Sequence, residues 1–161
     1  MAKPRLPELS CEQPFGAAAA TVVELRAEEL LEHSDGVLDT DDVERVHDMR
    51  VASRRLRAAM EVFEPCFPRK RFRTALKEVK AVADALGERR DRDVSIGALE
   101  RFCGALAGPD PRGVQMMVER LREEQLQANE GLAPFVDPRR LSALRGRIAE
   151  LAAAAERRAT G

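Results

Sequence analysis

The feature that most constrains the fold is the regular interruption of amphipathic stretches by proline and glycine. Pro65 and Pro68 end one such stretch and Gly87 follows the next, because proline cannot continue a helix and glycine is preferred just after one. Segments rich in glycine, proline or aspartate separate the other stretches. The spacing predicts an all-α fold, an antiparallel bundle of about six helices, at residues 17–33, 41–64, 69–86, 92–106, 114–129 and 139–158.

The residue composition agrees with a single helical domain. The chain of 161 residues has no Trp or Tyr and few β-branched residues, so no strand pattern appears. Residues 1–16 hold three prolines and no apolar stretch, which predicts a flexible N-terminal arm and no signal peptide before a domain at 17–158. No apolar run is long enough to cross a bilayer. Cys11, Cys66 and Cys103 form no Cys-x-x-Cys motif and are expected to be reduced thiols of a cytoplasmic protein.

Segment 45–57, RVHDMRVASRRLR, concentrates five arginines and a histidine in a short stretch of predicted helix. On a helical wheel, His47 and three of the arginines, Arg50, Arg54 and Arg57, form one stripe about 15 Å long. Arg55 lies apart from this stripe, at about 80° from His47. The core is expected to contain the apolar side of the same helix, Met49, Ala52, Leu56, Ala59, Met60 and Phe63, and also Met116 and Met117.

The next predicted helix carries a second row of cations. Arg69, Arg73, Lys77 and Lys80 lie together beside an apolar side that comprises Phe72, Ala75, Leu76, Val79, Val82, Ala83 and Leu86. Residues 45–92 contain 14 Lys and Arg against 7 Asp and Glu, and the rest of the chain has the opposite imbalance. Antiparallel packing of the two helices would place their basic stripes side by side.

Two interpretations of the basic stripes follow from the residues alone. In the first, they form a solvated helix surface that is neutralised by acidic neighbours, such as Glu28, Glu29, Glu32 or Asp42. In the second, they bind an anion. Arginines spaced three and four residues apart repel each other in an isolated helix, and guanidinium groups bind oxyanions, phosphate above all, through forked hydrogen bonds. Two parallel stripes favour the second interpretation.

The residues also carry a resemblance to a known family. The pattern H-x-x-R-x-x-x-R-R-x-R begins at His47 and is followed by a proline break, a basic amphipathic helix and the segment LGERRDRDV at 86–94. This order resembles the CHAD family, the conserved histidine α-helical domain, whose all-helical members bind inorganic polyphosphate along a basic groove or pore. The resemblance implies an anion site that contains His47, Arg50, Arg54, Arg55, Arg57 and Arg90, with Lys77, Lys80 and Arg73 from the second basic stripe.

The resemblance also sets expectations for activity and assembly. We expect a non-catalytic cytoplasmic protein without cofactor or metal. The purpose of polyphosphate binding stays open between storage, granule targeting and regulation of another enzyme. Asp91 and Asp93 are expected to cap and begin the helix that follows, and not to bind the anion. Family members usually contain two pseudo-symmetric helical halves, and this chain resembles one of them. We therefore expect a homodimer in which the same patch of each copy pairs about a two-fold axis.

Two alternatives remain open at this point. His47 and Asp48, together with His33 and either Asp91 or Asp93, imitate the metal ligands of HD-type phosphohydrolases, in which metal-activated water attacks a phosphate. The basic stripes could also bind the phosphates of a nucleic acid. Because Trp and Tyr are absent from the sequence, such binding would rest on phosphate contacts without base stacking and would be non-specific.

Overall fold

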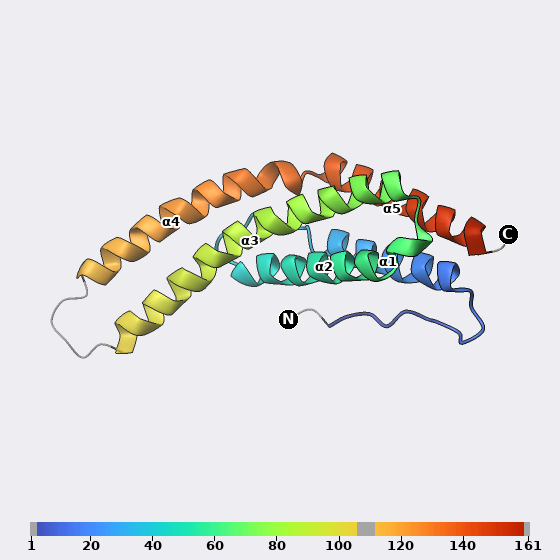
Figure 1. The fold of residues 1–161 in the computed structure, drawn as a ribbon. Helices are drawn as coiled ribbons and strands as arrows, with labels where there is room; N and C mark the ends of the chain where they lie inside the picture. Colours follow the sequence, from blue (N-terminus) through green and yellow to red (C-terminus); the bar gives the residue numbers. More distant parts are fainter. Residues whose placement is uncertain (1–2, 106–111, 160–161) are drawn as a thin grey trace.

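The prediction of an all-α fold is confirmed. The computed structural model describes residues 3–105 and 112–159, and within them it contains five α-helices, two short 3₁₀ turns and no strand. Five long helices therefore replace the predicted six. They are α1 (Phe15–Glu32), α2 (Val43–Val62), α3 (Arg69–Ala105), α4 (Arg112–Leu132) and α5 (Pro138–Ala159), with 3₁₀ turns at Glu64–Cys66 and Ala133–Phe135 (Figure 1).

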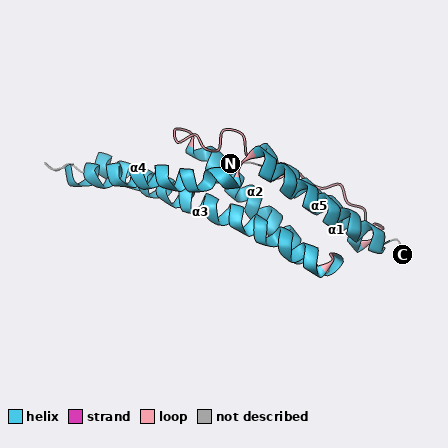
Figure 2. Ribbon diagram, turned by 90° about the horizontal axis from the view of Figure 1, so that it is seen from above, coloured by secondary structure: helices cyan, strands magenta, loops and turns pink. Residues whose placement is uncertain are grey.

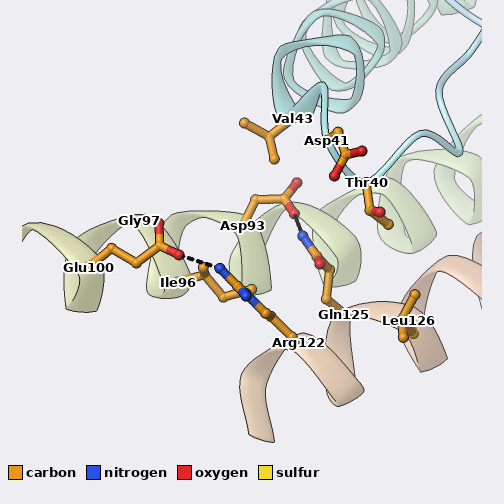
Figure 3. A pocket seen from close by; sticks show the side chains of 10 residues that line it. All are labelled: Thr40, Asp41, Val43, Asp93, Ile96, Gly97, Glu100, Arg122, Gln125 and Leu126. Atoms are coloured by element: carbon orange, nitrogen blue, oxygen red, sulfur yellow. Dashed lines mark hydrogen bonds and ion pairs between the residues drawn. The ribbon is translucent and has the colours of Figure 1, made fainter. Parts of the chain in front are cut away.

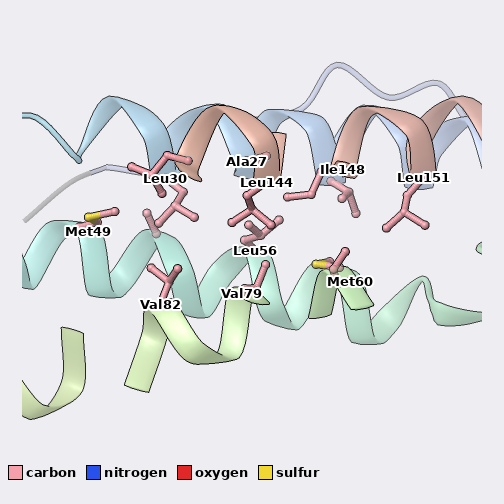
Figure 4. Close-up of a cluster of buried hydrophobic side chains, with 14 of the residues drawn as sticks. Ala27, Leu30, Met49, Leu56, Met60, Val79, Val82, Leu144, Ile148 and Leu151 are labelled. Atoms are coloured by element: carbon pink, nitrogen blue, oxygen red, sulfur yellow. The ribbon is translucent and has the colours of Figure 1, made fainter. Parts of the chain in front are cut away.

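The hydrophobic core lies where α1, α2, α5 and the first half of α3 pack together. Helix α1 lies beside both α2 and α5, and α2 packs against α3. Met49, Leu56 and Met60 on the apolar side of α2 are fully buried, as the helical spacing predicts. Figure 4 shows them with the core side chains of the neighbouring helices, among them Ala27, Leu30, Val79, Val82, Leu144, Ile148 and Leu151.

The two helices predicted at 69–86 and 92–106 are one continuous helix, α3. Gly87 does not end it and Asp91 does not begin another, so both predictions are wrong. Positive φ, typical of a glycine after a helix, occurs among the described residues only at Gly36 (φ 66°). Glycine inside a helix costs about 1 kcal/mol, and burial offsets this cost. One side of α3 stays buried before and after Gly87, at Phe72, Ala75, Val79, Val82, Leu86, Arg89, Asp93 and Ile96.

The second half of α3 and the first half of α4 extend beyond the ends of α1 and α2 (Figures 1 and 2). In this extension α3 and α4 pack against each other, so only one side of each helix is covered. Met116 and Met117 are 70% and 56% exposed, and the prediction that they belong to the core is wrong. The predicted helix end at residue 106 and most of the turn at 108–113 lie outside the described residues.

The chain before α1 contacts that helix through Arg5, and the turn after α1 contains Gly36. The backbone N–H of Arg5 donates to Glu29 Oε1 at 2.7 Å, and the Arg5 guanidinium lies 3.2 Å from Glu32 Oε1. Helix α1 ends at Glu32 with His33 as its C-cap, and Gly36 then reverses the chain toward α2. None of the described helices is apolar over a length that could cross a membrane.

Candidate functional site

Helices α2 and α3 form an antiparallel pair that brings the two basic stripes together. The start of α2 contacts the middle of α3, where Arg90 Nη1 donates to the carbonyl oxygen of Val43 at 3.1 Å. The end of α2 contacts an earlier part of α3, where Lys80 Nζ lies 3.5 Å from Glu61 Oε1. We call the resulting surface the basic face. It comprises His47, Arg50, Arg54 and Arg57 of α2, and Arg73, Lys77, Lys80 and Arg90 of α3.

Two cations of the basic face share one carboxylate. Arg57 Nε donates to Glu61 Oε1 at 3.0 Å, and Lys80 reaches the same oxygen from the neighbouring helix. The hydrogen bond from Arg57, with the charges of Arg57 and Lys80, lowers the pKa of Glu61 below its ordinary value. Glu61 is therefore ionised at neutral pH and bridges α2 to α3 at this end of the basic face.

At the other end, Arg90 joins the helices. Its guanidinium donates to Val43 O and lies 3.7 Å from Glu44 Oε1. One turn earlier, α2 lies close to α3, since a Cβ built at Gly87 would lie in van der Waals contact with Arg50 Nε, at 3.9 Å. The guanidinium of Arg50 thus lies next to the α3 backbone, and Arg90 is held by α2 rather than projecting freely.

Four further cations of the basic face have no carboxylate partner among the described residues: Arg50, Arg54, Arg73 and Lys77. Arg54, Arg73 and Lys77 are exposed, and Arg50 and His47 are partly buried. The acidic residues that the first interpretation assigned to neutralise these cations pair elsewhere: Glu28 and Glu32 with Arg5, Glu29 with Arg26, and Asp42 with Arg45.

The structure separates Arg55 from the other predicted site residues. Arg55 is partly buried, and its positive charge acts on Glu29 of α1. Burial alone would raise the pKa of Glu29, but hydrogen bonds from Arg26 and from the Arg5 N–H, together with the charges of Arg26 and Arg55, lower it below 4.5. Arg55 thus lies close enough to α1 for its charge to act on Glu29, in agreement with its separate place on the helical wheel.

A buried polar group between α3 and α4 was not predicted. Arg89 is 0% exposed, its Nη1 donates to Asp93 Oδ1 at 2.6 Å, and Gln125 Nε2 donates to the same oxygen at 2.6 Å. Burial raises the pKa of Asp93, while hydrogen bonds from Gln125 and Arg89 and the charges of Arg89 and Arg90 oppose this rise. Asp93 is thus an internal partner of Arg89, and the prediction that it lies in the first turn of a new helix is wrong. In the sequence, the four-residue spacing between Arg89 and Asp93 is the only indication of this ion pair.

The cavity in Figure 3 lies between the start of α2, α3 and α4 and is separate from the basic face. Its volume is about 540 Å³. Asp93 and Gln125 meet in its wall, and Arg122 Nη2 donates to Glu100 at 2.8 Å on another side (Figure 3). The remaining walls are Thr40, Asp41, Val43, Ile96, Gly97 and Leu126, so none of the predicted anion-binding residues lines this cavity.

The residues that the phosphohydrolase alternative requires are divided between separate places. His33 and Asp48 line a small cavity of about 240 Å³ that does not include His47, and Asp93 is buried against Arg89 and Gln125. Over residues 3–105 and 112–159, no three or more His, Cys, Asp or Glu side chains gather closely enough to hold a metal ion.

Comparison with known proteins identifies the family. No curated protein and no solved structure is similar enough to count as a match. The sequence model of the CHAD domain matches residues 21–161, which include all five helices except the first turns of α1. The family is known for binding polyphosphate and is generally non-catalytic. Because the match covers most of the chain and contains the basic stripes of α2 and α3, this chain belongs to the CHAD domain family.

Proposed function

We propose that this protein binds inorganic polyphosphate along the basic face, without catalysis. The observation that carries the proposal is the antiparallel pairing of two cationic rows, in which Arg50, Arg54, Arg73 and Lys77 lack a carboxylate partner in the described part of the chain. Keeping like charges together costs free energy in the unbound protein. A linear anion with regularly spaced charges would neutralise both rows at once.

The chemistry of the basic face favours polyphosphate over the alternatives. Guanidinium groups donate pairs of hydrogen bonds to phosphate oxygens, and the α2 row alone offers Arg50, Arg54 and Arg57. Proteins that bind single-stranded nucleic acids usually add aromatic side chains on which bases stack. None of the eight residues that make up the basic face is aromatic apart from His47. Binding of a nucleic acid would therefore use only its phosphates.

Calorimetric titration tests this proposal. We expect long-chain polyphosphate to bind orders of magnitude more tightly than monophosphate and more tightly than duplex DNA. For single-stranded nucleic acids, log affinity falls by about 0.7 per log salt concentration for each neutralised phosphate. By analogy, about four to six phosphate contacts give a slope of log affinity against log salt of about −3 to −4. Equal affinity for monophosphate and long-chain polyphosphate would contradict the proposal and leave a simple anion site.

A second assay tests the absence of catalysis. Incubation of the protein with Mg²⁺ or Mn²⁺ and either polyphosphate or a nucleotide should release no phosphate above background. Turnover that is lost in both His47→Ala and Asp48→Ala would instead support the phosphohydrolase alternative.

The proposal includes a homodimer of a cytoplasmic protein that associates with polyphosphate granules or regulates another protein. The homodimer is supported by large apolar side chains on the extension of α3 and α4. Val94, Phe102, Met116 and Met117 are all more than half exposed there. Exposed apolar groups of this size often mark contact surfaces. Light scattering should show a dimer whose population rises with added polyphosphate, because a ligand that bridges two copies stabilises the assembly. A strict monomer in both conditions would refute it.

A further inference from the structure

A single carboxylate is built into the row of cations on α2. Arg50, Arg54, Arg57 and Glu61 follow each other at spacings of four, three and four residues, which places all four on one side of the helix. Glu61 is thus the last member of a row whose first three members belong to the proposed binding surface. Its charge is opposite to that of the other three.

The contacts of Glu61 resemble those expected of a bound phosphate. One oxygen, Oε1, accepts from Arg57 Nε at 3.0 Å and lies 3.5 Å from Lys80 Nζ. The side chains of Arg57, Lys80 and Glu61 are 45%, 41% and 42% exposed, so a dissolved anion can reach all three. Ion pairs this exposed contribute little, because water screens them. Glu61 can therefore be displaced, but an incoming anion must compete with it.

We propose that Glu61 acts as an internal competitor for phosphate at Arg57 and Lys80, and thereby makes the basic face selective for long polyphosphate over short phosphate anions. This inference rests on the proposed polyphosphate binding and names the residue that sets its chain-length preference.

The selectivity follows from effective concentration. A long chain held by Arg50 and Arg54 presents its next phosphates to Arg57 at an effective concentration in the millimolar range, so it displaces the carboxylate without a new encounter from solution. A short anion gains no such advantage. It meets a site whose two cations already share a counter-charge, and it is repelled by Glu61 if it binds beside it.

Glu64 provides a matched control. It lies three residues after Glu61, in the 3₁₀ turn Glu64–Cys66, and is exposed. No ion pair of Glu64 is found within the described ranges. Glu61→Gln and Glu64→Gln remove the same charge from neighbouring places and preserve the size of the side chain, so they separate a local effect of Glu61 from a change in net charge.

The experiment is a titration of the full-length wild type, Glu61→Gln and Glu64→Gln with tripolyphosphate and with long-chain polyphosphate at one salt concentration. We expect Glu61→Gln to bind tripolyphosphate roughly twofold to fivefold more tightly, with a smaller gain for the long chain, so that the ratio of the two affinities falls. Glu64→Gln should change both affinities slightly and leave the ratio unchanged.

The possible results separate this inference from the proposed function. If the wild type binds long-chain polyphosphate but Glu61→Gln has the same affinity ratio as Glu64→Gln, the role of Glu61 is overturned and polyphosphate binding stands. If Glu61→Gln binds both ligands less tightly, Glu61 positions the cations instead of competing for them. If the wild type binds no long-chain polyphosphate, the proposed function and this inference both fail.

Discussion

Substitution of Gly87 by alanine tests the continuous helix α3. At Gly87 the backbone has no positive φ, and the only described atom outside the helix that a new Cβ would approach within 4 Å is Arg50 Nε, at 3.9 Å. That distance is an ordinary van der Waals contact, so the methyl group fits. Alanine in place of glycine inside a helix stabilises the folded state by about 0.5–1 kcal/mol. We therefore expect Gly87→Ala to raise the free energy of unfolding by about this amount.

The opposite sign is expected if the helix ends at Gly87. A glycine just after a helix has the left-handed conformation, in which alanine costs about 1–2 kcal/mol. Gly36→Ala is the matched control, because Gly36 has φ 66° and a Cβ there would lie 2.7 Å from Arg45 Nη1. Urea unfolding followed by far-UV circular dichroism measures both variants, with the m-value as a check on two-state behaviour. A destabilised Gly87→Ala would refute the continuous helix.

Three further variants test the basic face, the buried pair and the contact between the N-terminal segment and α1. Arg54→Ala should weaken polyphosphate binding by about 1–3 kcal/mol and reduce the salt slope of binding by about 0.7. The free energy of unfolding should stay unchanged, because Arg54 is exposed and has no carboxylate partner among the described residues. A large loss of stability would show that Arg54 has a structural role instead. Asp93→Ala should cost about 3–5 kcal/mol in urea unfolding, because it leaves the fully buried Arg89 without its counter-charge; a loss below about 1 kcal/mol would contradict the importance of this pair. Folding lowers the pKa of Glu29. Between that lowered pKa and 4.5, the unfolded chain binds more protons than the native one. The contribution of Glu29 to stability is therefore present above pH 4.5 and is lost as the pH falls through the lowered pKa. Unfolding curves between about pH 5 and pH 3 should therefore decline less steeply for Glu29→Gln than for the wild type, and identical slopes would exclude this role.

The parts of the structure that could be predicted are those that local periodicity determines. The spacing of apolar residues predicted the buried side of α2, where Met49, Leu56 and Met60 are fully buried, and it placed Arg55 apart from the other arginines. Both results depend only on the geometry of one helix. The antiparallel contact between α2 and α3 followed from the short connection through Pro65 and Pro68, which leaves little choice of direction.

The parts that could not be predicted depend on contacts between distant residues. Gly87 has the local properties of a helix end, but burial of α3 against its neighbours on both sides of this residue outweighs its low helix propensity. The hydrogen bond between Gln125 and Asp93 joins residues 32 positions apart, and the sequence pattern does not relate them. Met116 was expected in the core because its residue type is apolar, and it is exposed because the extension of α3 and α4 has no third helix to cover it.

Continuity of α3 links the buried pair to the basic face. Arg89 and Arg90 are adjacent, so their side chains leave the helix about 100° apart. Asp93, the partner of Arg89, also accepts a hydrogen bond from Gln125 of α4, and Arg90 donates to Val43 O at the start of α2. One turn of α3 therefore fixes the positions of both neighbouring helices. If α3 were interrupted at Gly87, the segment that carries both arginines could rotate independently of Arg73, Lys77 and Lys80, and the start of α2 would no longer be held in line with the second basic row. The unbroken helix therefore joins the segment that contacts the start of α2 to the segment that carries Arg73, Lys77 and Lys80.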